Sequence, residues 1–171
     1  MYKVGIITMS DKGARGERED KSGPMIEQIL KENSQYEVIE KILIPDDKET
    51  IERELVQMSD KLYLDLILTT GGTGFSMRDV TPEATLAVAD RIAPGIAEAI
   101  RAYSMTITKR AMLSRGVSVI RNQTLIVNLP GSPKAVKEGL EYIVSELSHG
   151  IDILKGTAGE CAREEHVIHE V

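Results

Sequence analysis

The chain has 171 residues, and its 21 Lys and Arg against 27 Asp and Glu give a formal net charge of −6. This length is typical of one domain, and a hydrophobic fraction of 42% can form a core, which excludes general disorder. The negative charge disfavours non-specific nucleic-acid binding, and no apolar run approaches the roughly 20 residues that span a membrane. The single cysteine excludes an internal disulfide, and the short apolar stretch at the N-terminus does not fit a signal peptide. The sequence therefore predicts a soluble cytoplasmic protein.

The first half of the chain alternates short apolar runs with helical patterns. Strands are expected at 2–8, 38–44 and 64–69, where apolar residues run almost without interruption. Between them, Ser22 and Asp47 stand where a side chain can cap the start of a helix. This alternation predicts parallel strands joined by right-handed crossover connections.

The second half adds a hairpin and further helices. Thr81 followed by proline predicts a helix start, and Pro94 interrupts that helix before another one follows. Two apolar runs at 117–121 and 124–128 flank a two-residue turn, as expected for a tight antiparallel hairpin. Ser132, again followed by proline, opens a last long helix.

From these elements we expect an α/β fold, a three-layer sandwich with a central, mostly parallel sheet and a short antiparallel hairpin. Residues 1–155 are expected to form this one domain. Residues 156–171 are expected to be a polar C-terminal tail.

A loop rich in glycine and threonine follows the third predicted strand. Three glycines and three threonines occupy the six positions 69–74. Ligands of open α/β sheets bind at the carboxyl ends of strands, and glycines let backbone N–H groups approach an anion closely. The alternative is a flexible turn, although a turn does not require this composition. Because the spacing fits neither the P-loop nor the dinucleotide-binding fingerprint, NTPases and common dehydrogenases are disfavoured.

A second candidate anion site is the segment LPGSPK at 129–134, between the last strand and the last helix. Ser132 can cap the helix, the helix start offers free N–H groups and a partial positive charge, and Lys134 adds a full charge. An ordinary capped helix start is the alternative interpretation.

Basic residues are concentrated in one stretch of this acidic chain. Residues 101–121 hold five arginines and lysines and no acidic residue. Such an excess suggests an anionic partner such as a polyphosphate, whereas the alternative is a set of basic residues scattered around a helix and a hairpin. The five are Arg101, Lys109, Arg110, Arg115 and Arg121.

Carboxylates lie close to the predicted anion loops. Asp46 and Asp47 follow the second strand, and Asp79 lies five residues beyond Gly74. Carboxylates beside a phosphate site often hold Mg²⁺ together with substrate oxygens. A helix cap is the alternative for each, and it is the preferred interpretation for Asp47.

With these segments in view, the chain resembles the molybdopterin adenylyltransferase family of the bacterial Mog type, which is related to the G domain of gephyrin and its plant counterpart. The segments that carry the resemblance are SDKGARGEREDKSGP at 10–24, IPDD at 44–47, DLILTTGGTGFSMRDVTPEAT at 65–85 and LPGSPKA at 129–135. The resemblance implies a homotrimer that uses ATP and Mg²⁺. It also implies transfer of AMP from ATP to the terminal phosphate of molybdopterin, with release of pyrophosphate. A downstream metal-insertion enzyme would use the product.

The resemblance also implies roles for individual residues. Asp46 and Asp79 match the essential acidic positions, and we expect both to be catalytic and to hold the metal. Ser104 aligns with a polar position on the pterin side, and IPDD stands where IPDE is commoner. The other residues implied in substrate binding are Ser10, Asp20, Ser22, Thr70, Gly71, Gly72, Thr73, Gly74, Pro130, Gly131 and Ser132.

Two other functions compete with the enzyme. One is a non-catalytic relative that binds molybdopterin, and the other is a scaffold module. Related branches of the family lose the Arg-Asp pair before the V-T-P stretch, and its presence as Arg78 and Asp79 favours the enzyme.

Overall fold

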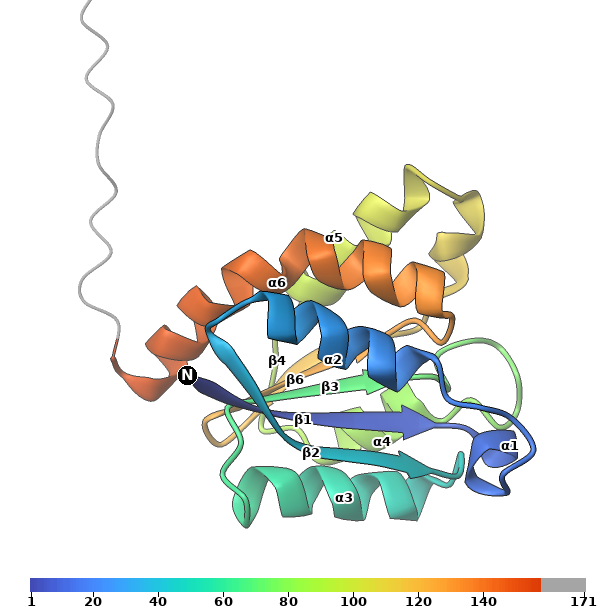
Figure 1. Ribbon diagram of the computed structural model, residues 1–171, viewed down its shortest axis with the longest axis horizontal. Coiled ribbons are helices and arrows are strands. Elements are labelled where there is room, and N and C mark those ends of the chain that lie inside the picture. The colour runs from blue at the N-terminus through green and yellow to red at the C-terminus, as the bar shows by residue number, and fades with distance from the viewer. Residues whose placement is uncertain (158–171) are drawn as a thin grey trace, which may run out of the picture.

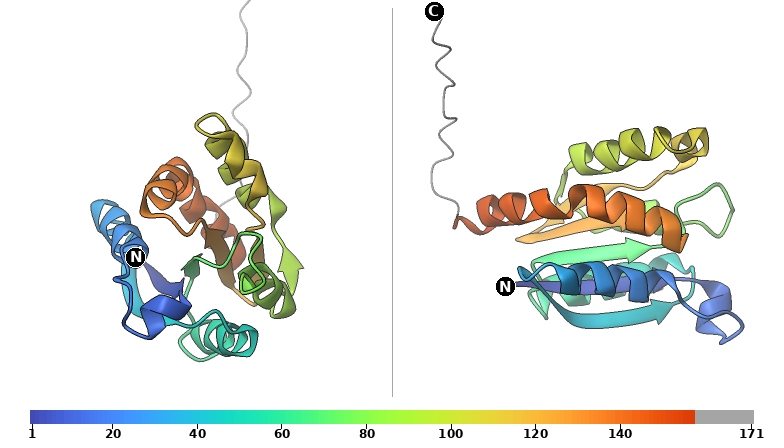
Figure 2. Two further views of the ribbon diagram at one scale, coloured as in Figure 1. Left: turned by 90° about the vertical axis from the view of Figure 1, so that its right-hand side faces the viewer. Right: turned by 45° about the horizontal axis from the view of Figure 1, so that its top comes forward.

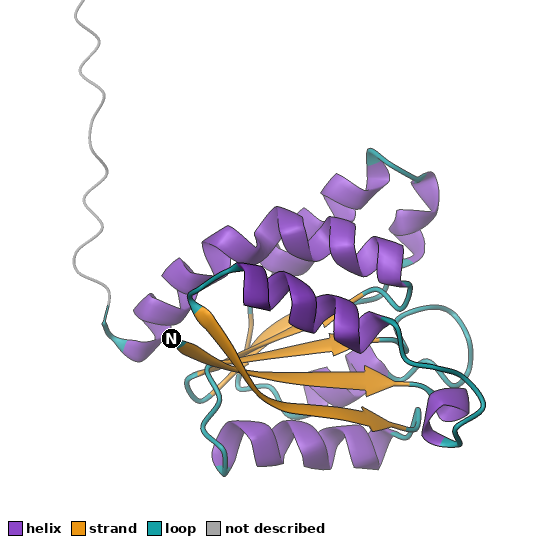
Figure 3. Ribbon diagram, viewed as in Figure 1, coloured by secondary structure: helices purple, strands orange, loops and turns teal. Residues whose placement is uncertain are grey.

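The computed structural model describes residues 1–157. The strands are β1 (Tyr2–Met9), β2 (Tyr36–Ile44), β3 (Leu66–Thr70), β4 (Arg91–Ile92), β5 (Ser118–Arg121) and β6 (Thr124–Leu129). The helices are α1 (Asp11–Ala14), α2 (Ser22–Glu32), α3 (Lys48–Asp60), α4 (Thr81–Ala87), α5 (Pro94–Met105), the 3-10 helix η1 (Lys109–Leu113) and α6 (Pro133–Lys155). Figure 3 shows how the two kinds of element alternate.

All six strands form one sheet, in the order β2-β1-β3-β6-β5-β4. Strands β2, β1, β3 and β6 are parallel. Strand β5 runs antiparallel to β6, and β4 runs antiparallel to β5. The parallel strands point the same way, toward the end of the molecule where α1 lies (Figure 1). The predicted mostly parallel sheet and the hairpin of β5 and β6 are both confirmed.

Helices cover both faces of the sheet, which confirms the three-layer prediction. In Figures 1 and 2, α2, α5 and α6 lie on one side of the sheet and α3 and α4 on the other. Each side has its own buried apolar cluster, because strand residues alternate between the two faces. Leu66 and Leu68 of β3 face α2 and α6, for example, whereas Ile67 between them packs with residues of α3 and α4.

Two predicted helix caps are confirmed and two are wrong. Asp47 caps α3 and Ser132 caps α6 through their side chains. Ser22 and Thr81 are instead the first helical residues of α2 and α4. Their hydroxyls donate to backbone carbonyls of distant loops. The start of α2 is held by Asp20, whose Oδ1 accepts two backbone N–H groups at 3.0 Å.

No pattern in the sequence predicts α1, β4 and η1, because elements of two to five residues show no apolar periodicity. The predicted domain end at 155 coincides with the end of α6, which Gly156 caps in the left-handed conformation. Most of the expected tail lies outside the described residues, so that expectation stays a prediction. Within residues 1–157, no helix is long and apolar enough to cross a membrane.

Tyr36 at the start of β2 makes the stability of the fold depend on pH. Its hydroxyl donates to the carbonyl of Val144 in α6 at 2.8 Å, and burial raises the pKa of Tyr36 to about 12. Below pH 10 the folded and unfolded chains both keep the proton. Above pH 10 the unfolded chain loses it first, so stability falls by about 1.4 kcal/mol per pH unit until the folded pKa is reached.

Urea unfolding at pH 9 and 11 should show this loss of stability. Tyr36→Phe should show a smaller loss than the unsubstituted chain, and equal losses would contradict the role of Tyr36.

Candidate active site

A cleft lies at the point in the sheet where the chain changes the side on which it adds its next parallel strand. From β1 the chain crosses to β2 on one side and later to β3 on the other, so the connections diverge at the carboxyl ends of β1 and β3. Such a switch point is where open α/β sheets bind ligands. The cleft has a volume of about 790 Å³. The predicted site residues that line it are Ser10, Asp20, Ser22, Asp46, Thr70, Gly71, Gly72, Asp79, Gly131 and Ser132.

Four predicted site residues do not line this cleft. Thr73 and Gly74 lie further along the glycine-rich loop, and Gly74 closely approaches the Asp79 carboxylate. Pro130 and Ser104 line a second, smaller pocket of about 220 Å³ between α5, η1 and α6. Since Pro130 precedes Gly131 in the chain, the loop after β6 separates the two cavities.

The glycine-rich loop has a backbone that only glycine adopts readily. Gly71 and Gly72 have φ values of +93° and +65°. A side chain at Gly71 would overlap the backbone carbonyl of Met9 at the end of β1. Thr70 and Thr81 hold this loop, because their hydroxyls donate to the carbonyls of Pro130 at 2.6 Å and of Gly71 at 2.9 Å. The loop is therefore held to the loop after β6 and to the start of α4 rather than being a flexible turn.

The loop after β6 presents the start of the longest helix to the cleft. Ser132 accepts the N–H of Ala135 at 3.2 Å, and the hydroxyl of Ser22 donates to the carbonyl of Gly131 at 2.8 Å. Pro133 has no N–H, and the N–H of Val136 donates to the carbonyl of Ser132. The N–H of Lys134 and the partial positive charge of the helix start therefore suit an anion. Ser22 thus both lines the cleft and joins the starts of two helices.

Two polar residues of the first loop also hold local structure. Asp20 accepts the hydroxyl of Thr8 at 2.8 Å in addition to the N–H groups of α2. Ser10 accepts the N–H of Gly13 at 3.0 Å and so caps α1. Both line the cleft, and the contacts fix their side chains in place.

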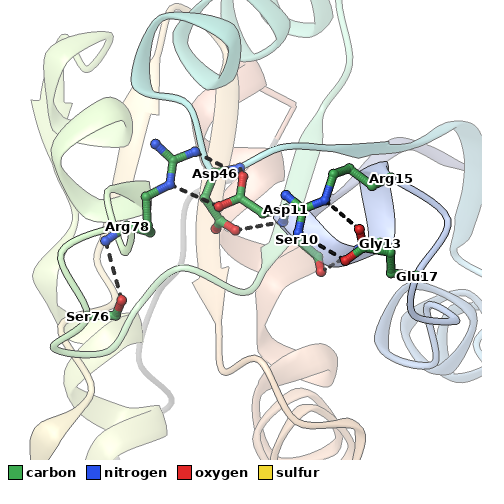
Figure 4. A network of polar contacts seen from close by, with 8 residues as sticks. All are labelled: Ser10, Asp11, Gly13, Arg15, Glu17, Asp46, Ser76 and Arg78. Atoms are coloured by element: carbon green, nitrogen blue, oxygen red, sulfur yellow. Dashed lines mark hydrogen bonds and ion pairs between the residues drawn. The ribbon is translucent and has the colours of Figure 1, made fainter.

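Asp46 is held by a reciprocal pair of hydrogen bonds with Asp11. The N–H of Asp11 donates to Asp46 Oδ2 at 2.9 Å, and the N–H of Asp46 donates to Asp11 Oδ1 at 3.0 Å. The guanidinium of Arg78 donates to both carboxylate oxygens of Asp11 at 2.9 Å (Figure 4). This network connects the loops after β1, β2 and β3. Sequence reasoning missed it, because no local pattern pairs residues that are 35 and 67 positions apart.

The charge around Asp46 favours a cation. Burial raises the pKa of Asp46, and the charges of Asp11 and Asp79 raise it further, whereas hydrogen bonding from Asp11 acts in the opposite direction. The Arg78 guanidinium lowers the pKa of Asp11. Within residues 1–157, no group of three or more His, Cys, Asp or Glu side chains is arranged to hold a metal by itself.

The basic stretch at 101–121 is not a free anion-binding surface. Arg121 pairs with Asp60, and Arg101 donates to the carbonyls of Ser114 and Gly116. Arg115 pairs with an acidic residue of α4 and with loop carbonyls. The interpretation as a binding patch is therefore wrong for these three. Lys109 and Arg110 are exposed.

The second pocket contains an unusual hydroxyl. Ser104 is 9% exposed, and its Oγ has no hydrogen-bond partner. Behind the pocket, the amide of Asn128 donates to the hydroxyls of Thr69 and Thr85 at 2.9 and 3.0 Å, which fixes β6 beside β3. Sequence reasoning missed Asn128. A single polar residue within an apolar strand is the only signal that could have found it.

Comparison with known proteins identifies the family. A family described as a probable molybdopterin binding domain matches residues 5–149. The molybdopterin adenylyltransferase of Escherichia coli K12 is 47% identical over 143 residues, which is 82% of this chain and 73% of that protein. The molybdopterin adenylyltransferase of Helicobacter pylori J99 is 38% identical over 159 residues, 90% and 88% of the two chains.

A solved structure agrees with these relatives. The molybdopterin biosynthesis enzyme MoaB of Thermus thermophilus superposes with a TM-score of 0.86 at 46% identity, covering 91% of this chain and 98% of its own. The family match over residues 5–149 includes every residue that lines the two cavities. The chain therefore belongs to the family of probable molybdopterin binding domains, as the motifs at its strand ends predicted.

Proposed function

We propose that the protein is a molybdopterin adenylyltransferase. An oxygen of the terminal phosphate of molybdopterin forms a bond to the α-phosphorus of ATP, and the bond between that phosphorus and the bridging oxygen breaks. Pyrophosphate leaves with the electron pair. The observation that carries the proposal is one cleft that brings Asp46 and Asp79 together with the glycine-rich loop and the start of α6. The relatives named molybdopterin adenylyltransferase support the same activity.

The cleft suits phosphate groups better than a neutral ligand. Backbone N–H groups near Gly71, Gly72 and Gly131 and the start of α6 can face phosphate oxygens without intervening side chains. Phosphoryl-group chemistry needs positioning and charge stabilisation more than a covalent nucleophile. We assign the phosphates of ATP and of molybdopterin to this cleft, with Ser10, Asp20 and Ser22 along its other wall.

The two carboxylates fit a bound Mg²⁺. Such an ion is usually held by one or two carboxylates, water and substrate phosphates, and Asp46 and Asp79 supply that number. Burial is the main cause of the raised pKa of Asp46, and the charges of Asp11 and Asp79 add to it, whereas the Arg78 charge lowers it. A bound cation would offset the two carboxylate charges. When bound, Mg²⁺ would offset charge that develops on the phosphate oxygens. The protein holds Asp46 in position through Asp11 and holds Asp79 within the loop after β3.

We place the pterin in the second pocket, beside Ser104. An unpaired buried hydroxyl costs about 1–3 kcal/mol, so a ligand that bonds to it removes this cost. Ser104→Ala should therefore leave stability unchanged or raise it, while molybdopterin affinity falls about tenfold. Thermal melts and calorimetric titration check the two effects. A loss of stability with unchanged affinity would mean that Ser104 serves the core instead.

The proposed activity is tested by pyrophosphate release. Purified protein with ATP, Mg²⁺ and molybdopterin should release one pyrophosphate for each adenylylated molybdopterin formed. A non-catalytic relative would bind molybdopterin without releasing pyrophosphate. We expect the product to be passed to a metal-insertion enzyme and both steps to occur in the cytoplasm, where ATP is abundant.

We also expect a homotrimer. Four large apolar side chains at 105–113 are exposed, so they are not part of the core of one chain. A closed symmetric assembly would bury such a surface. Light scattering at micromolar concentration should give three times the 18.8 kDa of one chain. A mass of one chain would overturn this expectation and leave the enzymatic proposal in place. The exposed residues are Met105, Ile107, Met112 and Leu113.

A further inference from the structure

Arg115 lies between η1 and β5, and it lines neither the cleft nor the second pocket. The backbone on either side of it is fixed, because Arg101 Nη1 donates to the carbonyls of Ser114 at 3.2 Å and Gly116 at 2.8 Å. Its side chain is 33% exposed, so it does not act as a free surface charge. The backbone of Arg115 is thus held by α5, outside the cleft.

This guanidinium holds both ends of the loop that carries Asp79. Nε donates to the carbonyl of Gly74 at 2.7 Å, and Nη2 donates to the carbonyl of Asp79 at 2.6 Å. The N–H of Arg115 also donates to the carbonyl of Thr73 at 2.9 Å. Three carbonyls of the segment 73–79 therefore accept hydrogen bonds from one residue.

Apolar packing gives this loop little support. Phe75 is 72% exposed and Met77 is 97% exposed. Within the loop, Asp79 Oδ2 accepts the N–H of Ser76 at 2.9 Å, and the N–H of Asp79 donates to the carbonyl of Ser76 at 3.0 Å. The position of the Asp79 carboxylate thus depends on polar contacts. The hydrogen bonds from Arg115 connect the loop to β5 and η1, and the ion pair of Arg78 with Asp11 connects it to the loop after β1.

Glu83 orients the guanidinium. Its carboxylate in the first turn of α4 pairs with Nη1 of Arg115, and this pairing lowers the pKa of Glu83. The planar fork of arginine can satisfy Glu83 and two carbonyls at once. A lysine ammonium would keep the charge but could not reproduce this geometry.

We propose that Arg115 is a positioning residue for Asp79: it fixes the loop at 74–79 so that the carboxylate faces the cleft. The inference rests on the proposed function, in which Asp79 helps to hold Mg²⁺ beside the phosphates. A misplacement of about 1 Å can lower a rate by about a hundredfold. Loss of the hydrogen bonds from Arg115 to this loop should therefore lower kcat more than it changes KM for ATP.

The test compares Arg115→Met and Arg115→Lys with Arg121→Met in the full chain. Arg121 is a matched control, because it also holds a carboxylate, Asp60, and a backbone carbonyl, that of Val88, at the other end of β5. Amide hydrogen exchange at Ser76 and Asp79 measures the loop, and kcat and KM for ATP measure the chemistry.

We expect exchange at these two amides to speed up at least tenfold in both Arg115 variants, with kcat falling about ten- to a hundredfold. Arg121→Met should change neither, although it lowers stability. Unchanged exchange and kcat in Arg115→Met would overturn the inference. If that variant does not fold, normal exchange and kcat in Arg115→Lys would do so, because charge alone would then suffice. An unsubstituted chain without AMP transfer would refute the proposed function, and the exchange data alone would then decide the role of Arg115.

Discussion

Asp79→Asn should leave the fold intact and remove most AMP transfer. Asn can still accept the N–H of Ser76 through its amide oxygen, so the loop keeps its local contact. It cannot supply the negative charge that would hold a Mg²⁺ ion, which in turn would offset the charge developing on the phosphate oxygens. We expect a loss of about 3–5 kcal/mol at the transition state, which is about a 10²- to 10⁴-fold fall in kcat.

Single-turnover AMP transfer beside a thermal melt measures this effect. Asp90→Asn is the matched control, because Asp90 also accepts a backbone N–H, that of Asn122, but lies away from the cleft. The control should keep its full rate. A folded Asp79→Asn with normal turnover would remove Asp79 from the catalytic site.

Much of the fold could be predicted because apolar runs and helix periodicity are local signals. The strands around 2–9, 36–44, 66–70 and 124–129 are almost wholly buried or carry an alternating pattern, and the sequence places each to within a few residues. The parallel order follows from the alternation with helices.

The errors in helix capping have a physical cause. Ser22 and Thr81 have the residue types that cap helices, but their hydroxyls bond to Gly131 and Gly71, which lie 109 and 10 residues away. The capping preference of a residue type depends on local sequence and carries no information about partners in another loop. Asp47 and Ser132, whose side chains hold no distant loop, do cap their helices.

The candidate site could be predicted to the level of loops, but not to the level of networks. Strand order places the loops after β1, β2, β3 and β6 at one edge, so the predicted residues meet there. The contacts that fix them are long-range, such as Arg78 with Asp11 and Arg115 with Asp79. The run of basic residues is visible in the sequence, but whether each arginine faces solvent or a carbonyl depends on the tertiary structure.

Gly71→Ala should be among the most damaging single substitutions at the cleft. Alanine is strained at a φ of +93°, which costs about 1–3 kcal/mol. Its methyl group would also overlap the carbonyl of Met9, so β1 and β3 would have to separate at their carboxyl ends. Overpacking of this kind adds about 1–3 kcal/mol. We expect the free energy of unfolding to fall by about 2–5 kcal/mol, and ATP affinity to fall with it because the cleft widens.

Urea unfolding and calorimetric titration measure the two effects at one protein concentration, since the proposed homotrimer would make stability depend on concentration. Gly150→Ala is the control. Gly150 lies within α6 with no atom within 4 Å of an added methyl, so alanine should raise stability by up to about 1 kcal/mol through helix propensity. If Gly71→Ala lowers the free energy of unfolding while Gly150→Ala raises it, the loss comes from the backbone conformation and close packing at Gly71. It then does not come from replacing a glycine in general. If Gly71→Ala unfolded at the same urea concentration as the unsubstituted chain and bound ATP equally well, the loop could accept a side chain, and the close approach of β3 to the end of β1 would not define the cleft.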